Sequence, residues 1–195
     1  MQKKEGERLQ GCSHDGIDTH QTSYFKEIFK QIMPHVMELA RGRRIIQEHL
    51  NRDGPIIIDP FARNCELAGE WTNDLDVDTK ARHHVDALQF IKTAPRIHFE
   101  LAILDPPFSS AMAERKYGAK NIYADGSYFS KVAKALVDNL VSGGFLLKFG
   151  FNTTRHDGRL ELVKFWSCNC GGNRNDVLVS LWRKSQTTLA EFTDR

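Results

Sequence analysis

The sequence has no long apolar run, and neither sign of charge dominates it. None of its hydrophobic stretches approaches the ~18 residues that a membrane-spanning helix needs, so we do not expect a membrane protein. The 27 basic residues stand against 25 acidic residues, which leaves a net charge of +2. A chain so nearly balanced has no pervasive nucleic-acid-binding surface, and any basic surface has to be local.

Cysteine is also scarce, with four in the whole chain. Two of them, Cys168 and Cys170, are too close in sequence for an ordinary disulfide framework, and the N-terminus lacks the basic and apolar regions of a secretory signal. These features predict a reducing, cytoplasmic environment. A zinc site would have to join this pair to Cys12 and His14, a spacing unlike that of the common zinc motifs, so we expect no metal.

The length of 195 residues and the hydrophobic content of 41% predict one domain with a real core. Residues 1–22 are polar and aperiodic, which predicts a flexible N-terminal arm, either mobile or ordered by a substrate. The single domain then covers residues 23–195. It begins with helices over residues 23–50, where Pro34 is expected to kink or divide the segment, and its core spans residues 55–182.

Short apolar runs alternate with stretches of helical periodicity along this core. A helix is expected over residues 127–141, ending at residues 142–144 (SGG), and a helix or helix and turn over residues 77–91. The expected strands are PIIID (55–59), EWTND (70–74), HFELAILD (98–105), FLLKFGF (145–151), LELVKFWSCN (160–169) and DVLVSLWRK (176–184). A turn-like loop separates the last two strands. The pattern predicts an α/β fold, a three-layer α/β/α sandwich with a mostly parallel sheet and a C-terminal antiparallel hairpin.

Aspartates stand at the ends of the first three expected strands, as Asp59, Asp74 and Asp105, and Asp86 lies between the second strand and the third. Ligands of open parallel sheets bind beyond the carboxyl ends of the strands, so we expect all four carboxylates at one crevice. An acid at the end of the second strand is the usual partner of a ribose diol, because a carboxylate accepts both hydroxyl protons. Two structural alternatives stay open: Asp59 could cap the turn that follows it, and Asp86 could be a helix N-cap.

The residues DPPF (105–108), after an apolar strand, are similar to the catalytic motif of the amino-group DNA methyltransferases. These enzymes transfer a methyl group from S-adenosylmethionine to adenine N6 or cytosine N4, and the variant that begins with Asp points to adenine. IIIDPFARNC (56–65) resembles the first motif of the family, TNDLD (72–76) the strand end that holds the ribose, and VDAL (85–88) the acid that reads the adenine amino group of the cofactor. The resemblance covers the catalytic core over residues 55–182. It implies a Rossmann-like methyltransferase fold, and is closest to the short methylases of phages and prophages, hence a bacterial or phage-infected host cytoplasm.

The resemblance implies four catalytic residues, Asp105, Pro106, Pro107 and Phe108. The amino nitrogen of adenine is a poor nucleophile, because its lone pair is delocalised into the ring. The Asp105 carboxylate and the Pro106 carbonyl could each accept one N–H bond and favour a pyramidal nitrogen. The consecutive prolines hold that carbonyl in place, and Phe108 would stack on a flipped-out base, an interaction worth ~1–3 kcal/mol. The alternative is that these residues are only a strand terminus and a rigid turn.

The cofactor implied is S-adenosyl-L-methionine. The residues implied to bind it are Asp59, Pro60, Phe61, Asn64, Asp74, Leu75, Asp86 and Ala87. The first motif of the family usually carries glycines, whereas Ala62, Arg63 and Asn64 occupy that turn here. Asn64 can adopt positive φ, and the bulk of Arg63 could obstruct the site or contact the carboxylate of the cofactor.

The expected macromolecular partner is DNA. The loop over residues 109–127 follows the catalytic motif and carries basic and aromatic residues that could grip a phosphate backbone, unless it is merely a solvated loop. The candidates for substrate contact are Arg115, Lys116, Tyr117, Lys120, Lys148 and Asn152. The chain leaves little room for a separate target-recognition domain, so we expect weak or loop-encoded sequence specificity.

We therefore expect an S-adenosylmethionine-dependent methyltransferase that modifies adenine N6 in DNA. Two alternatives stay open. The first is the same catalyst acting on RNA, and the second is a binding or anti-restriction protein that keeps the cofactor fold without catalysis. A homo-oligomer is compatible with either.

Overall fold

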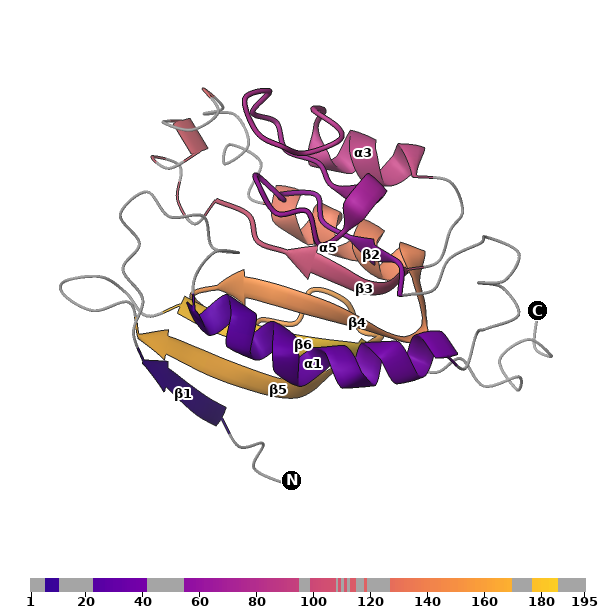
Figure 1. Ribbon diagram of the computed structural model, residues 1–195, viewed down its shortest axis with the longest axis vertical. Coiled ribbons are helices and arrows are strands. Elements are labelled where there is room, and N and C mark those ends of the chain that lie inside the picture. The colour runs from indigo at the N-terminus through magenta and orange to yellow at the C-terminus, as the bar shows by residue number, and fades with distance from the viewer. Residues whose placement is uncertain are drawn as a thin grey trace.

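One six-stranded sheet organises the computed structural model, which describes residues 6–10, 23–41, 55–94, 99–107, 109, 111, 113–114, 118, 127–169 and 177–185. The strand order is β1-β5-β6-β4-β3-β2 (Figure 1). The strands are β1 (Gly6–Gln10), β2 (Ile57–Ile58), β3 (Phe99–Leu104), β4 (Leu140–Gly150), β5 (Leu160–Asn169) and β6 (Val177–Lys184). The helices are α1 (Ser23–Arg41), the 3-10 helix η2 (Gly69–Trp71), α3 (Ala87–Thr93) and α5 (Tyr128–Asn139).

The pairing of the strands confirms the expected sheet. Strand β2 is parallel to β3, β3 is parallel to β4, and β1 is parallel to β5. Strand β6 is antiparallel to both of its neighbours, β4 and β5. Three pairs are therefore parallel and two antiparallel, and the C-terminal hairpin is the one that the sequence predicts.

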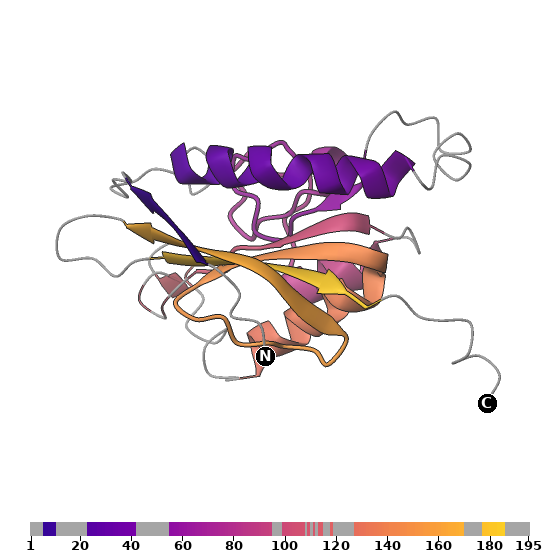
Figure 2. The ribbon, with the colours of Figure 1, turned by 90° about the horizontal axis from the view of Figure 1, so that it is seen from below.

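Helices cover both faces of the sheet and make the expected three layers. Helix α1 lies over one face, and α3 and α5 pack on the other (Figure 2). Successive residues of β3 alternate between the two cores: Leu101 and Ile103 pack with α1, whereas Ala102 and Leu104 pack with α3 and α5. From Leu101 to Leu104 both faces of β3 are apolar because both are covered.

Helix α1 is continuous through Pro34, which lies inside it. Its buried residues follow the spacing of one helical face: Phe25, Ile28, Ile32, Val36 and Ala40. Pro34 is on the exposed side, where water can satisfy the carbonyl that loses its intrahelical partner, so the helix is not divided there. The expected continuation to residue 50 lies outside the described residues. No described helix, α1 included, is both long and apolar enough to cross a membrane.

The second expected strand, residues 70–74, is not a strand of the sheet. Helix η2 takes up its first half, and only two isolated parallel bridges follow, Asp59 with Thr72 and Asn73 with His83. Because η2 continues to Trp71, only three residues of the expected strand remain to pair with their neighbours. The side-chain amide of Asn73 adds to the backbone bonds there and donates to the carbonyls of Pro60, at 3.1 Å, and Val85, at 3.0 Å.

Two further boundaries differ from the sequence-based expectation. Residues 6–10, expected in a flexible arm, form the edge strand β1, because the backbone of β5 offers them a partner over Phe165 to Asn169. Strand β4 begins at Leu140, so the SGG sequence does not merely end α5 but lies within the strand. Between the pairs Phe99–Leu140 and Leu101–Phe145, β3 advances two residues and β4 advances five, a wide bulge in which Gly143 has a φ of +78°.

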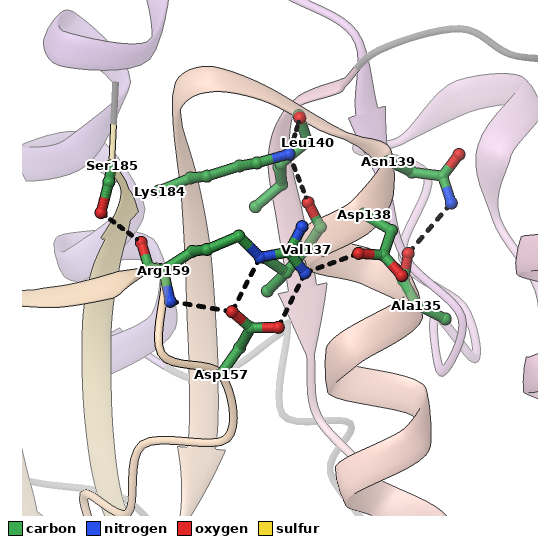
Figure 3. A network of polar contacts seen from close by, with 9 residues as sticks. All are labelled: Ala135, Val137, Asp138, Asn139, Leu140, Asp157, Arg159, Lys184 and Ser185. Carbon is green, nitrogen blue, oxygen red and sulfur yellow. Dashed lines mark hydrogen bonds and ion pairs between the residues drawn. The ribbon is translucent and has the colours of Figure 1, made fainter. Parts of the chain in front are cut away.

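Charged side chains fix the C-terminal end of α5 (Figure 3). Lys184 donates from Nζ to the carbonyls of Val137, at 2.8 Å, and Leu140, at 2.7 Å. The Val137 carbonyl also accepts the backbone N–H of Leu140, the C-cap residue of α5. Beside them Arg159 bridges Asp157 and Asp138, and the hydrogen bonds from Arg159 lower the pKa of Asp157 to about 2. The network ties α5 to β6 and to the loop before β5.

We expect Lys184→Met to lower the free energy of unfolding by about 1–2 kcal/mol, because it removes two charge-assisted hydrogen bonds and keeps the aliphatic stem. Urea unfolding, followed by circular dichroism, measures the change. The control is Lys92→Met, which removes an exposed lysine in the last turn of α3. Equal unfolding midpoints for the two variants would show that the α5 carbonyls do not need Lys184.

Candidate active site

A hollow lies where the loops after β2 and β3 meet the N-terminal ends of α3 and α5. It encloses about 320 Å³, part of which is open to solvent. Its lining residues are Pro60, Phe61, Asn73, Leu75, Val85, Asp86, Ala87, Pro107 and Tyr128. Five of these come from the predicted cofactor set and one from the predicted catalytic set, so the structure brings the two sets together at the carboxyl edge of the sheet.

Asp86 is the N-cap of α3, as one of the two alternatives proposed. Its Oδ1 accepts hydrogen bonds from the backbone N–H of Leu88, at 2.9 Å, and Gln89, at 3.1 Å. Its Oδ2 is not used by the cap and accepts the Tyr128 hydroxyl at 2.5 Å. Capping a helix and contacting a ligand are therefore compatible for this carboxylate.

Tyr128 is a site residue that sequence reasoning misses. It belongs to the helical periodicity of α5, and nothing local distinguishes it from a core aromatic residue. Burial and the hydrogen bond to Asp86 raise the pKa of Tyr128 well above its ordinary value, so its hydroxyl stays protonated and donates. Its ring meets Phe129 edge-on, and Phe129 in turn contacts Phe61 across the hollow wall, with centroids 6.3 Å apart.

Asn73 and Val85 are the other lining residues absent from the predicted set. Besides its two donor bonds, Asn73 accepts the backbone N–H of Val85 at 3.1 Å through Oδ1. The Asn73 side chain thus joins three segments: the turn after β2, its own segment and the residues before α3. An asparagine among the other polar residues of this segment carries no sequence signal of this role.

Asp74, predicted to hold a ribose, does not line the hollow. It is 1% exposed, and its two oxygens accept the backbone N–H of Arg63, at 3.1 Å, and Asp76, at 3.0 Å. Burial raises the pKa of Asp74, against the opposing effect of these hydrogen bonds and of the Arg63 charge. In this structure its carboxylate holds two turns together.

Asp59 and Asn64, also predicted to bind the cofactor, lie outside the lining as well. Asp59 is 1% exposed and its Oδ1 accepts the backbone N–H of Phe61 at 3.0 Å, so the turn-cap alternative is the one observed. Asn64 is exposed, and its Oδ1 accepts the backbone N–H of Lys80 at 3.1 Å. Both residues shape the first-motif turn rather than face the hollow.

Asn64 can adopt positive φ by its residue type, but in the structure the residue of this turn with positive φ is Arg63. Arg63 has a φ of +47° and is the sole non-glycine residue with positive φ in the described part of the chain. The bond from its N–H to Asp74 holds it there, and its guanidinium lies 3.9 Å from a carboxylate oxygen of Asp76. A left-handed conformation costs an L-residue roughly 1–2 kcal/mol, so this turn stores strain where the family usually has glycine.

We expect Arg63→Gly to be more stable than Arg63→Ala by about 1 kcal/mol, because glycine adopts positive φ without the steric cost that Ala pays. Both variants lose the same guanidinium contact with Asp76. Urea unfolding compares them, with Asn64→Gly and Asn64→Ala as the matched pair at a neighbouring position without positive φ. At position 64 the alanine variant should be the more stable one, because glycine raises the conformational entropy of the unfolded chain and relieves no strain there. If the glycine variant were the more stable one at both positions, or the alanine variant at both, Arg63 would not be strained by its positive φ.

The turn after β3 carries the predicted catalytic residues. Asp105 and Pro106 are half-buried, and Pro107 is buried in the wall of the hollow. Phe108 lies outside the described residues. So do four of the predicted substrate contacts, Arg115, Lys116, Tyr117 and Lys120.

The remaining two substrate candidates, Lys148 and Asn152, contact each other. Lys148 is buried at the carboxyl end of β4, opposite Leu104, and its Nζ donates to Asn152 Oδ1 and to the Thr154 carbonyl, both at 3.1 Å. Burial lowers the pKa of Lys148 to about 8. Neither candidate lines the hollow, although β3 places Lys148 beside the residue that precedes Asp105.

We expect the stability of the wild type relative to Lys148→Met to rise between about pH 8 and pH 10.5. Over this interval the unfolded lysine still binds a proton that the folded one has lost, so folding becomes more favourable. The pKa of His156 is lowered by burial and by the Lys148 charge, so that residue titrates below the interval. Urea midpoints at several pH values test this, with Lys92→Met as control. A constant difference from pH 7 to pH 10.5 would contradict it.

Among the described residues, no group of three or more histidine, cysteine, aspartate or glutamate side chains could hold a metal ion. Cys168 is a buried residue of β5. The other members of the zinc set considered from the sequence, Cys12, His14 and Cys170, lie outside the described residues.

Comparison with known proteins identifies the fold. No family model and no curated protein sequence matches the chain. Among solved structures, yhhF from Escherichia coli, a protein assigned as a methyltransferase, superposes with a TM-score of 0.54 at 11% identity, over 90% of this chain and 92% of that one. The chain therefore has the Rossmann-like methyltransferase fold.

Two more distant matches were found. The N-methyltransferase NodS from Bradyrhizobium japonicum WM9 has a TM-score of 0.45 at 14% identity, over 76% of this chain and 97% of its own. TrmN from Thermus thermophilus has a TM-score of 0.49 at 13% identity, over 72% and 47% of the two chains. We draw no conclusion from these two.

Proposed function

We propose that this protein is an S-adenosylmethionine-dependent methyltransferase that methylates the N6 amine of adenine in DNA. The observation that carries the proposal is the composition of the hollow, in which residues expected to hold the cofactor meet Pro107 of the DPPF motif. On this fold, a crevice at the carboxyl edge of the sheet is where a nucleoside ligand binds.

The lining suits an adenine ring. Asp86 supplies an acceptor for the 6-amino group. Ala87 is the first residue of α3, where a backbone N–H has no partner within its helix, and it lies in the lining beside Asp86. Leu75 is 39% exposed at the edge of the hollow, and a flat ring bound there would cover its apolar surface. Phe61 and Val85 add apolar wall.

The bound cofactor supplies an electrophilic sulfonium methyl group. Pro107 lines the hollow and Asp105 stands two residues before it, so the DPPF turn would hold the target amine beside that methyl. The Asp105 carboxylate and the Pro106 carbonyl would each accept one N–H of the amine and turn its lone pair toward the methyl carbon. The lone pair forms the new N–C bond as the S–C bond breaks, and an N–H proton leaves to water.

DNA is the favoured substrate because the variant of the motif that begins with Asp resembles the adenine-N6 DNA enzymes. An amino group inside a duplex is out of reach, so the target base has to be flipped out of the stack. Lys148 and Asn152, near the carboxyl end of β4, remain candidates for contacts to that substrate.

The test is methyl transfer from labelled S-adenosylmethionine to DNA duplexes with and without adenine, and to RNA of the same sequence. We expect label in adenine-containing DNA, and a loss of at least about 100-fold with Asp105→Asn, which keeps the shape and removes the charged acceptor. Asp78→Asn is the matched control, since it removes an exposed carboxylate away from the hollow. Calorimetry with S-adenosylhomocysteine should show that Asp105→Asn still binds.

Each other outcome points elsewhere. Cofactor binding without transfer to any adenine-containing nucleic acid would favour the non-catalytic binding protein. Preferential transfer to RNA would keep the catalyst and change the substrate. No binding of S-adenosylhomocysteine by the wild type would overturn the proposal, and would point to the strained turn at Arg63 as the obstruction.

A further inference from the structure

Tyr128 connects two helices at the hollow. It is the first residue of α5, and its hydroxyl reaches Asp86, the N-cap of α3, 42 residues earlier in the chain. The two helices pack against each other on the same face of the sheet. The hydrogen bond therefore fixes the Asp86 carboxylate relative to both helix ends.

The hydrogen bonds of Asp86 leave little freedom for a ligand. Each carboxylate oxygen has two lone-pair positions. Oδ1 accepts from both Leu88 and Gln89, which fills its two positions, and Oδ2 accepts from Tyr128, which fills one of its two. What Asp86 can still offer the hollow is one acceptor position, on Oδ2.

We propose that Tyr128 is a positioning residue that makes this hollow select a 6-amino purine over a 6-oxo purine, an inference that rests on the proposed function. The Tyr128 hydroxyl donates to Oδ2 of Asp86, which leaves Oδ2 one lone-pair position that can accept a hydrogen bond from a ligand. The Tyr128 oxygen, having given its proton to Asp86, can itself only accept, and the backbone N–H groups of Leu88 and Ala87 already lie against it. A 6-amino group supplies the N–H donor that Oδ2 requires, whereas a 6-oxo group would bring a further acceptor against these oxygens.

The surroundings of Tyr128 keep its hydroxyl in this role. The pKa of Tyr128 is raised by burial and by Asp86, so the hydroxyl does not ionise near neutral pH and cannot become a repelling anion. Its ring stands edge-on to Phe129, at 84° with centroids 5.3 Å apart, and Phe129 contacts Phe61 in the opposite wall. Ring packing thus sets the position of the Tyr128 side chain, and its hydroxyl provides the hydrogen bond that orients Asp86.

The experiment measures dissociation constants of S-adenosylhomocysteine and S-inosylhomocysteine by calorimetry. We expect the wild type to prefer the adenosyl compound by at least about tenfold, and Tyr128→Phe to reduce that ratio about tenfold, since a hydrogen bond to a charged group is worth a factor of that order. Ser130→Ala is the control, because it also removes a hydroxyl from the first turn of α5 but does not line the hollow. It should leave the ratio unchanged.

A second variant separates positioning from a merely structural role. Asp86→Asn keeps an oxygen for the cap and puts an amide donor in place of the other acceptor, so it should shift the preference toward the inosyl compound. If Tyr128 acts through Asp86, adding Tyr128→Phe to Asp86→Asn should change the ratio no further.

The outcomes distinguish the two proposals. If the wild type binds neither compound, the proposed function fails. If the wild type binds but Tyr128→Phe weakens both compounds equally, or leaves the ratio as it was, the role assigned to Tyr128 is wrong while the function stands. If Tyr128→Phe does not fold, a wild type without preference for the adenosyl compound, or an Asp86→Asn variant with unchanged preference, overturns the assignment.

Discussion

The buried side chain of Asn73 is the constraint on which the site depends. Strand β2 has only two ladder residues, and the segment beside it contributes isolated bridges rather than a strand. So few backbone hydrogen bonds at this edge of the sheet do little to fix the loops that follow β2 and precede α3. The three side-chain hydrogen bonds of Asn73 join the turn after β2 to the residues before α3. These two segments supply Pro60, Phe61, Val85 and Asp86 to the lining of the hollow.

Helix α5 is a second element that positions the hollow, because polar contacts hold both of its ends. At its C-terminal end Lys184 satisfies two carbonyls, and at its N-terminal end Tyr128 reaches Asp86. The body of the helix is anchored by apolar residues such as Val132 and Leu136. A helix restrained at both ends holds its first residue at a fixed position in the hollow. A binding site built on such an element is more precise than one built on a loop.

The sequence predicts the framework well because local patterns encode it. The apolar run that becomes β3, the one-sided periodicity of α5 and the final hairpin each depend on residues close together in the chain. Four lining residues of the site were also predicted. Phe61 and Pro107 follow the ends of β2 and β3, and Leu75 and Asp86 belong to the motifs TNDLD and VDAL.

What the sequence could not predict depends on contacts between distant segments. Tyr128 joins the site through a partner 42 residues away, and Asn73 through partners 12 and 13 residues away. Asn64 tolerates positive φ by its residue type, but Arg63, whose N–H donates to Asp74, is the residue that adopts it. Asp74 was expected at the end of a strand and in contact with a ribose, yet no strand forms there and its two oxygens accept backbone N–H groups of Arg63 and Asp76.

Strand β1 has a bearing on how the protein can be handled. It is an edge strand of the sheet and pairs with five residues of its ten-residue neighbour β5 (Figure 1). A shortened form that begins after Gln10 would uncover the backbone of β5 from Phe165 to Asn169. Unpaired strand backbone recruits other strands, including those of identical molecules. Strand β1 therefore protects the protein against self-association, and an affinity tag is better attached away from this strand.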